Sequence, residues 1–175
     1  MIEHPIGTVG FHPRQRERFG SGELAAEWAR RYPELFDEDD LRLATSQPYH
    51  HFFEWLGAIV LFNTTGYLSL VEKYEFRAHP RKVQIVEQLV PPEALETMRG
   101  GEVQCPDLLV HAADLSDWFF CEVKGPGDRL RPAQKQYFAS LSTRCAKPIC
   151  VLRFRRMRVE GGTPLVGPNH DREQR

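Results

Sequence analysis

Two short apolar runs, residues 108–110 and 118–123, constrain most what this chain can fold into. Both are rich in β-branched or aromatic residues, and the segment that separates them, residues 113–117, contains polar residues typical of turns. This pattern predicts two strands joined by a short turn. A turn centred near Asp114 and Leu115 also sets the register of the hairpin, because it decides which residues of the two strands face each other.

The predicted register places Asp107 directly opposite Glu122. The Cβ atoms of such facing residues are roughly 4.5–5.5 Å apart, and like charges at that distance are destabilising. A proton held on one carboxyl group, or a divalent cation between the two, relieves the repulsion. Side chains alternate along a strand, so Lys124 lies on the same face as Glu122. These residues alone leave two alternatives open: a metal site, or a structural ion pair between Glu122 and Lys124 or a nearby arginine.

The sequence around this acidic pair resembles the VRR-NUC branch of the PD-(D/E)xK nucleases. The resemblance rests on three elements: Pro106-Asp107, the run Glu122-Val123-Lys124-Gly125-Pro126-Gly127-Asp128-Arg129-Leu130, and Gln134. It is close over residues 104–154 and weaker over 50–66. The long run after Glu122 makes the resemblance specific, because Pro-Asp and Glu-x-Lys alone are common in proteins.

The resemblance implies an α/β fold in which a central mixed β-sheet is flanked by helices, as in restriction endonucleases, with extra N-terminal helices. It implies a Mg²⁺ or Mn²⁺ site whose ligands are Asp107, Glu122 and the backbone carbonyl of Val123; these hard oxygen ligands suit such ions better than zinc. Lys124 is implied to orient or deprotonate the attacking water. Gln134 is implied to hold a water or phosphate oxygen, although a polar residue on the surface of an amphipathic helix is the alternative.

The family also places a glutamate on a helix before the hairpin, and Glu54 fits that position as a further metal ligand. Glu54 is the only acid in the dense apolar segment 49–62. A lone acid in so apolar a helix needs a partner. The alternative is an exposed polar stripe that Glu54 shares with the neighbouring histidines. Glu72 and Glu75 are the next candidates for this role.

Positive charge is concentrated near the motif, although the whole chain is close to neutral. The sequence has 23 Lys or Arg residues and 24 Asp or Glu residues, but residues 124–158 hold ten Lys or Arg against one acid. A basic stretch beside a metal site suits a phosphate backbone. We therefore expect Arg129, Arg131 and Lys135 to contact DNA. The alternative is a set of solvated surface charges.

Composition indicates one ordinary globular chain of 175 residues with no membrane partner. No run approaches the roughly 18 apolar residues of a membrane span, and the N-terminus lacks a signal-peptide pattern, so we expect a cytoplasmic protein. The cysteines form no Cys-x-x-Cys pair, which favours reduced core thiols over zinc ligands or disulfides. They are Cys105, Cys121, Cys145 and Cys150.

Three parts are expected along the chain. Residues 1–48 form an N-terminal arm with short helices, in which 1–20 are irregular and 21–31 are helical. Residues 49–158 form the nuclease core, with an insertion around 67–100 where a helical pair is plausible. The core includes helices over 49–64 and from Pro132 onward, and a strand over 147–154. Residues 159–175 form a disordered tail.

We predict a metal-dependent nuclease that hydrolyses DNA phosphodiester bonds, with branched, flap or junction DNA as its substrates, as in DNA repair. This substrate class comes from the resemblance, because small stand-alone members of the family resemble Holliday-junction resolvases and act as dimers. Symmetric cutting of two strands requires a homodimer with twofold symmetry. The alternative is a catalytically inactive DNA-binding or protein-interaction module with the same fold. The joint presence of Asp107, Glu122, Lys124 and Gln134 argues against that alternative.

Overall fold

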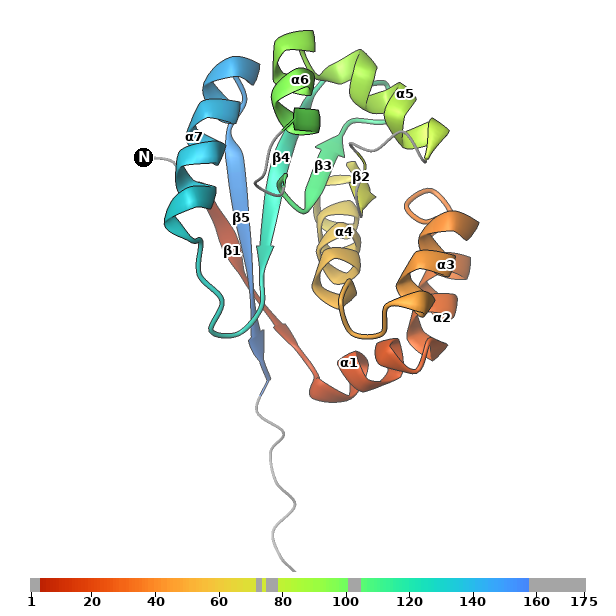
Figure 1. The fold of residues 1–175 in the computed structure, drawn as a ribbon. Helices are drawn as coiled ribbons and strands as arrows, with labels where there is room; N and C mark the ends of the chain where they lie inside the picture. Colours follow the sequence, from red (N-terminus) through yellow and green to blue (C-terminus); the bar gives the residue numbers. More distant parts are fainter. Residues whose placement is uncertain (1–3, 72–73, 75–78, 101–104, 158–175) are drawn as a thin grey trace, which may run out of the picture.

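The computed structural model describes residues 4–71, 74, 79–100 and 105–157. Within these ranges the chain forms a five-stranded sheet with helices on both faces (Figure 1). The strands are β1 (His4–Phe11), β2 (Leu68–Val71), β3 (Leu108–His111), β4 (Trp118–Lys124) and β5 (Ile149–Arg156). The helices are α1 (Pro13–Gly20), α2 (Glu23–Arg31), α3 (Glu38–Ser46), α4 (Phe52–Thr65), α5 (Pro80–Leu89), α6 (Pro92–Gly100) and α7 (Pro132–Cys145).

The sheet is mixed, as predicted. Its strand order is β1-β5-β4-β3-β2, with β4 in the centre. Strands β2, β3 and β4 pair antiparallel, whereas β4 pairs parallel with β5, and β5 pairs parallel with β1. A parallel pair needs a long crossover connection, which α7 supplies between β4 and β5. The predicted fold class is therefore confirmed.

The β3–β4 hairpin has the register expected from the sequence. Leu108 pairs with Cys121, and His111 pairs with Trp118. The turn contains Leu115, whose φ of 60° lies in the left-handed region. The predicted position of the turn is thus confirmed. Continuing this register by one residue brings Asp107, just before β3, to the level of Glu122 in β4.

Each face of the sheet covers its own hydrophobic core. Helices α1 to α4 pack on one face and α5 to α7 on the other, and Figure 1 shows the two groups apart. Strand β4 alternates between the cores, since Cys121 and Val123 belong to the first core and Phe120 to the second. The same alternation directs Glu122 and Lys124 toward the α7 side of the sheet.

Helix α4 packs closely against the sheet at Gly57. A Cβ atom at Gly57 would lie 3.1 Å from Cγ2 of Val123, so a larger residue would push the helix away from β4. The helix ends at Gly66, whose φ of 75° provides the left-handed C-cap. The predicted helix and its C-terminal stop are confirmed, with the first turn starting at Phe52 rather than at residue 49.

The N-terminal region differs from the prediction. Residues 1–20 were expected to be irregular, but β1 and α1 occupy most of the described part of this segment. Glycine and proline weaken the local strand signal of β1, and its hydrogen-bonding partner, β5, lies at the other end of the chain. Helix α1 begins with a capping box between His12 and Gln15. The prediction of an irregular arm is therefore wrong for these residues.

The insertion contains the predicted helical pair, α5 and α6, after the short strand β2. Helix α2 and strand β5 also lie where the sequence places them, and the segment that begins at Asp37, which the sequence leaves open between a short helix and a loop, forms α3. Glu72 and Glu75, and the tail expected over 159–175, lie outside the described residues. Among the described residues, no helix is long and apolar enough to cross a membrane.

Candidate active site

The acidic pair lies at one end of the β3–β4 hairpin. Asp107 precedes β3 and accepts a hydrogen bond through Oδ2 from the backbone N–H of Val123 at 2.7 Å. Glu122, within β4, is 2% exposed. The bond from Val123 fixes the Asp107 carboxyl group against β4. Two carboxyl groups, that of the partly buried Asp107 and that of the buried Glu122, are thereby held together.

The two carboxylate oxygens of Glu122 differ in their hydrogen-bond partners. Its Oε1 lies 2.6 Å from Nζ of Lys124 and accepts a hydrogen bond from Nε2 of Gln134 at 3.2 Å. Its Oε2 is buried and has no hydrogen-bond partner among the described residues. A buried carboxylate oxygen without a partner is costly, since desolvation is not compensated. This oxygen is available to a ligand that carries positive charge.

The electrostatics of the pair indicate excess negative charge. Burial, followed by the charges of Glu122 and Glu54, raises the pKa of Asp107 well above its usual value. Burial also raises the pKa of Glu122, although Lys124 opposes this shift. Both carboxyl groups are therefore harder to ionise than in water. A bound cation would reverse this effect.

Glu54 reaches the same place from the first turn of α4. Its side chain is 17% exposed, and its Oε2 lies 3.2 Å from Nδ1 of His51. The other ring nitrogen of His51 lies 3.3 Å from Oε1 of Gln47. The structure thus combines the two sequence-based alternatives, because Glu54 contacts a neighbouring histidine and also faces Asp107.

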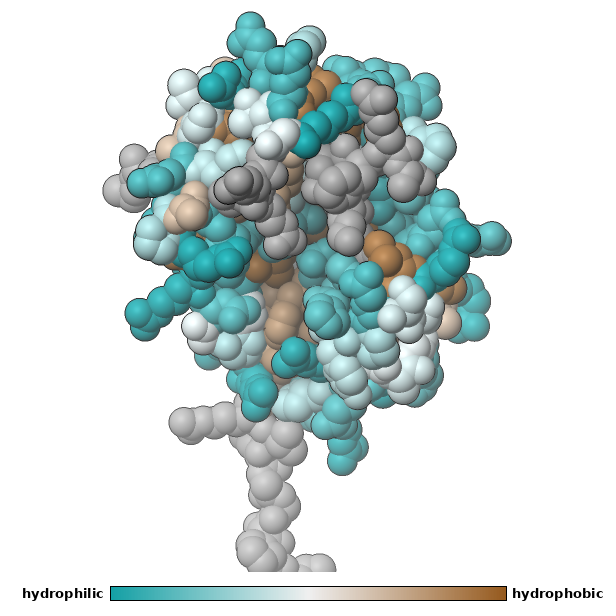
Figure 2. Space-filling model, in the orientation of Figure 1, coloured by the Kyte–Doolittle hydropathy of each residue, from teal (hydrophilic) through white to brown (hydrophobic). Residues whose placement is uncertain are grey.

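These side chains line one cavity of about 290 Å³. Helix α4 borders it from one face of the sheet and α7 from the other. Figure 2 shows a largely hydrophilic surface on this side of the molecule, with apolar residues visible in a central hollow. The lining residues are His50, Phe53, Glu54, Asp107, Glu122, Val123, Lys124, Gly125, Asp128, Arg129, Arg131 and Gln134.

Gln134 lies on the buried face of α7 rather than on its polar surface. It is 6% exposed, whereas the preceding residue, Ala133, is exposed. The amide has two functions: Oε1 accepts a hydrogen bond from the backbone N–H of Arg131 at 3.2 Å, and Nε2 donates to Glu122. Gln134 therefore joins the start of α7 to the acidic pair.

The basic residues expected to bind DNA lie at or near the opening of the cavity. Arg129 and Arg131 line it, and Lys135 is exposed on the first turns of α7. Four further lining residues were not among the predicted site residues: His50, Phe53, Gly125 and Asp128. Asp128 Oδ2 accepts a hydrogen bond from the backbone N–H of Gly125 at 3.1 Å, which closes the loop after β4. The sequence feature that could have indicated Asp128 is its position in the run Gly125-Pro126-Gly127-Asp128.

The donor set fits a divalent metal ion. Glu54, Asp107 and Glu122 supply carboxylate oxygens, and Val123 also lines the cavity. Hard oxygen donors of this kind suit Mg²⁺ and Mn²⁺. The unpartnered Oε2 of Glu122 and the raised pKa of Asp107 are the features expected where positive charge is missing.

The sequence matches a known domain family. The matching family is described as the VRR-NUC domain, and the match covers residues 59–159, more than half of the chain. The chain belongs to the VRR-NUC family. Its domain is therefore a nuclease domain of the PD-(D/E)xK superfamily. The matched range includes Asp107, Glu122, Lys124 and Gln134, whereas Glu54 lies before its first residue.

A search of solved structures finds a crystal structure described as paFAN1 bound to a 2-nucleotide 5′-flap DNA with a gap. This VRR-NUC chain is 20% identical to that protein, with a TM-score of 0.32. The similarity covers 83% of this chain and 22% of that one, so this chain spans about a fifth of the length of its match. No curated protein matches the sequence.

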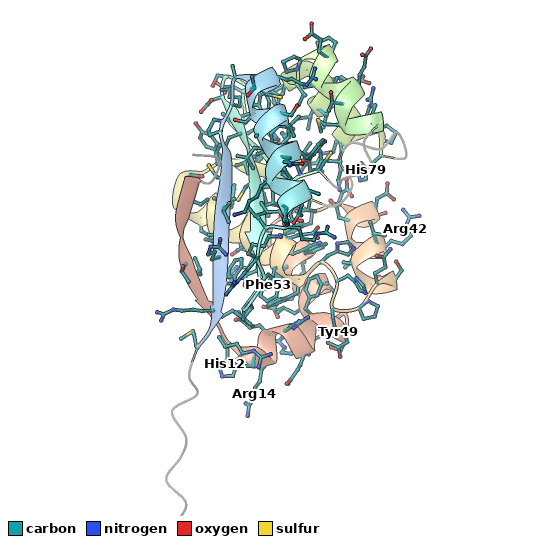
Figure 3. The ribbon with its side chains drawn as sticks, turned by 60° about the vertical axis from the view of Figure 1, so that its left-hand side comes forward. His12, Arg14, Arg42, Tyr49, Phe53 and His79 are labelled. Atoms are coloured by element: carbon teal, nitrogen blue, oxygen red, sulfur yellow. The ribbon has the colours of Figure 1, made fainter. Side chains whose placement is uncertain are left out.

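A second group of potential ligands occurs elsewhere in this VRR-NUC chain. Asp37, Asp40 and His79 place one potential ligand atom each within 4.8 Å of one another. The sequence indicates Asp37 and Asp40 only as the start of a short helix or loop, because His79 is distant in the chain. Figure 3 shows His79 beside the helix that carries Arg42, which is α3.

The oxygens of this second group are already in use. Asp37 caps α3 by accepting hydrogen bonds from the backbone N–H groups of Asp39 and Asp40. Asp40 pairs with the buried ammonium group of Lys82, which also donates to the carbonyl of Val71. A lysine thus supplies the positive charge here. The acidic pair at the hairpin is the better candidate for a metal centre.

Proposed function

We propose that this VRR-NUC chain is a Mg²⁺- or Mn²⁺-dependent nuclease that hydrolyses DNA phosphodiester bonds. The observation that supports this most strongly is the acidic pair of Asp107 and the buried Glu122, because Oε2 of Glu122 has no hydrogen-bond partner among the described residues while Lys124 and two arginines border the same cavity. The ion pair with Lys124 uses only Oε1 of Glu122, so Oε2 is left for a further positively charged partner. The arrangement suits a dication together with a phosphate.

Different residues of the site would bind the metal ion, orient the attacking water and position Glu122. Asp107, Glu122, the carbonyl of Val123 and Glu54 would hold the ion, which supplies charge to stabilise the phosphate and to acidify a water molecule. Lys124 would orient that water and offset charge on the phosphate, since Glu122 holds its ammonium group at the cavity. Only after losing its own proton would Lys124 accept a proton from that water. Gln134 keeps Glu122 in place and orients a water or phosphate oxygen.

The basic residues of the cavity would position the DNA. Arg129 and Arg131 can each donate two hydrogen bonds to one phosphate, and Lys135 adds charge at the start of α7. Contacts to phosphate position the DNA but do not read its sequence. Selectivity for branched, flap or junction DNA would therefore come from the shape of the substrate. Symmetric cutting of a junction would require a homodimer, with one active site for each strand.

A cleavage assay tests this proposal. Labelled four-way junction, flap and linear DNA are incubated with the protein in Mg²⁺, Mn²⁺ or EDTA. We expect cleavage only with metal, and faster cleavage of the branched substrates. Asp107→Ala and Lys124→Ala should each reduce the rate by at least about a hundredfold, since each removes a group that acts at the reacting atoms.

The control is Glu96→Ala, which removes an exposed acid of α6 on a helix that contributes no residue to the cavity. This variant should cut as fast as the wild type. If the wild type shows no metal-dependent cleavage while still binding DNA, the chain is an inactive binding module. If Asp107→Ala and Lys124→Ala cut at the wild-type rate, these residues are not the active site.

A further inference from the structure

A second cavity, of about 250 Å³, lies beside the candidate active site. Strand β1, helix α1, the end of β5 and the segment before α4 enclose it. No residue of the predicted site lines this cavity. Its lining residues are Phe11, Pro13, Arg16, Glu17, Tyr49 and Arg156.

The two cavities are separated by Phe53 and Phe11, which are in contact. Phe53 lines the active-site cavity, and the rings of Phe11 and Phe53 are in edge contact with centroids 5.1 Å apart. The guanidinium carbon of Arg16 lies 5.6 Å from the centre of the Phe53 ring. In addition, Tyr49 and His50 are consecutive, and each lines a different cavity. A strand bound in the active site therefore has the second cavity within reach of a neighbouring nucleotide.

Tyr49 packs against Gly20 but remains half open to solvent. It is 50% exposed, one of only three large hydrophobic residues exposed among those described. Its backbone φ of 71° is left-handed, which is strained for an aromatic residue. Its ring also covers Gly20 so closely that a Cβ atom there would lie 2.0 Å from Cε1 of Tyr49. A half-exposed aromatic ring packed on the protein can serve as a stacking surface for a base. Figure 3 shows Tyr49 and Phe53 near α1.

The charges around Tyr49 suit a nucleotide. Arg156 is exposed at the end of β5, and Nε of Arg16 is buried without a hydrogen-bond partner among the described residues. Both can donate to a phosphate. Glu17 would repel a free phosphate, but its carboxylate can accept hydrogen bonds from the amino group of a base. The cavity therefore presents an aromatic ring, phosphate donors and a base acceptor together.

We propose that this cavity binds one unpaired nucleotide of the DNA strand held in the nuclease site, with its base stacked on Tyr49. This proposal deepens the proposed function and rests on its assignment of DNA as the substrate. An unpaired base is required because a base within a duplex has its faces covered by its neighbours. Binding at this cavity would thus favour DNA with a flap or a junction over a continuous duplex.

Binding to flap DNA in EDTA tests the proposal without cleavage. The full chain is titrated with a labelled duplex that carries a short 5′ or 3′ flap, and with a blunt duplex of the same length. Tyr49→Leu should weaken flap binding by about tenfold, since stacking of one base on an aromatic ring contributes on this order. Binding of the blunt duplex should change by less than about twofold. Tyr49→Phe keeps the ring and should bind the flap like the wild type.

A second readout follows the base directly. Placing 2-aminopurine as the first unpaired nucleotide of the flap should give fluorescence that is quenched by the wild type and by Tyr49→Phe, but not by Tyr49→Leu. Arg156→Ala should weaken flap binding more than Arg99→Ala, a matched exposed arginine on α6. Thermal unfolding of each variant shows whether it folds. If Tyr49→Leu does not fold, the comparison of Arg156→Ala with Arg99→Ala tests the proposal.

The two proposals fail separately. If Tyr49→Leu and Arg156→Ala bind flap DNA as tightly as the wild type, the nucleotide cavity is wrong even when metal-dependent cleavage is present. If flap binding depends on Tyr49 but no metal-dependent cleavage occurs, the nuclease proposal fails while the nucleotide cavity stands.

Discussion

At the scale of single residues, the central feature is that the negative charges of Asp107 and Glu122 are only partly balanced by the ammonium group of Lys124. Lys124 and Gln134 both bind the same oxygen of Glu122. Asp107 accepts a hydrogen bond from the backbone N–H of Val123. The pKa of Asp107 is raised because ionisation here occurs in a buried site beside other carboxylates. Without metal, this pair should therefore destabilise the folded protein at neutral pH.

Asp107→Asn tests this destabilisation. A carboxyl group with a raised pKa in the folded state contributes stability at low pH that is lost as the pH rises above about 4, through its folded pKa. Without metal, the variant should therefore be more stable than the wild type at neutral pH, by on the order of 1 kcal/mol, and the difference should shrink in acid. Its amide oxygen can still accept the bond from Val123. Urea unfolding in EDTA at several pH values measures the difference. A variant less stable than the wild type at neutral pH would contradict this account.

At the scale of elements, the site depends on close packing between α4 and the loop after β4. A Cβ atom at Gly125 would lie 2.7 Å from Cε2 of Phe53 and 3.0 Å from Oδ2 of Asp128. Asp128 closes the loop by accepting the hydrogen bond from Gly125. Gly125 therefore allows the loop that carries the basic residues to lie against Phe53.

Gly125→Ala should destabilise the protein by about 1–3 kcal/mol, because the added methyl group forces Phe53 or the loop to move. Gly100→Ala is the matched control, since a Cβ atom at Gly100 would meet nothing within 4 Å. Denaturant unfolding compares the two variants. Adding Phe53→Leu to Gly125→Ala should recover part of the loss. Equal stability of the two alanine variants would show that the loop has room to spare.

A buried ion pair links the inserted helix α5 to α3. Lys82 of α5 is 3% exposed and contacts the carboxylate of Asp40 and the carbonyl of Val71. Burial raises the pKa of Asp40, and Lys82 opposes this shift. The pair therefore holds the insertion against both the N-terminal helices and strand β2.

Lys82→Met should lower the free energy of unfolding by about 3–5 kcal/mol, since it leaves a buried carboxylate without its counter-charge. Asp40→Asn in the same chain should restore part of this loss, because it removes the unpaired charge. A double-mutant cycle measured by denaturant unfolding gives the coupling energy. Additive effects of the two changes would show that the pair does not act as a unit.

The hairpin and the remote elements were not equally predictable. The register that brings Asp107 to Glu122 follows from a local turn and the alternation of side chains, so it could be predicted from sequence. Strand β1 could not, since its hydrogen bonds depend on β5 at the far end of the chain. The group formed by Asp37, Asp40 and His79 was missed for the same reason.

At the scale of the whole molecule, the site combines residues from the helices on both faces of the sheet. Glu54 and Phe53 come from α4 on one face, and Gln134 comes from α7 on the other. The role of Glu54 could be suggested only through the family resemblance, because no local pattern shows that α4 reaches the hairpin. The cavity beside Tyr49 needed the structure, since it joins four separate segments.

The basic residues should make DNA binding strongly dependent on salt. Each phosphate contact releases counterions, so the logarithm of the binding constant falls with the logarithm of the salt concentration. Arg131→Ala should weaken binding and reduce this slope by about 1, whereas Arg99→Ala on α6 should leave it unchanged. Binding titrations in EDTA at several salt concentrations measure the slope. A binding constant indifferent to salt would rule out phosphate contacts by these residues.

Metal binding tests the central claim most directly. Calorimetric titration of the protein with Mn²⁺, without DNA, should show binding in the wild type and in Asp37→Asn, since the oxygens of the second group are already used. Asp107→Asn and Glu122→Gln should abolish or greatly weaken that binding. If Mn²⁺ binding is lost in Asp37→Asn but persists in Asp107→Asn and Glu122→Gln, the hairpin is not the metal centre.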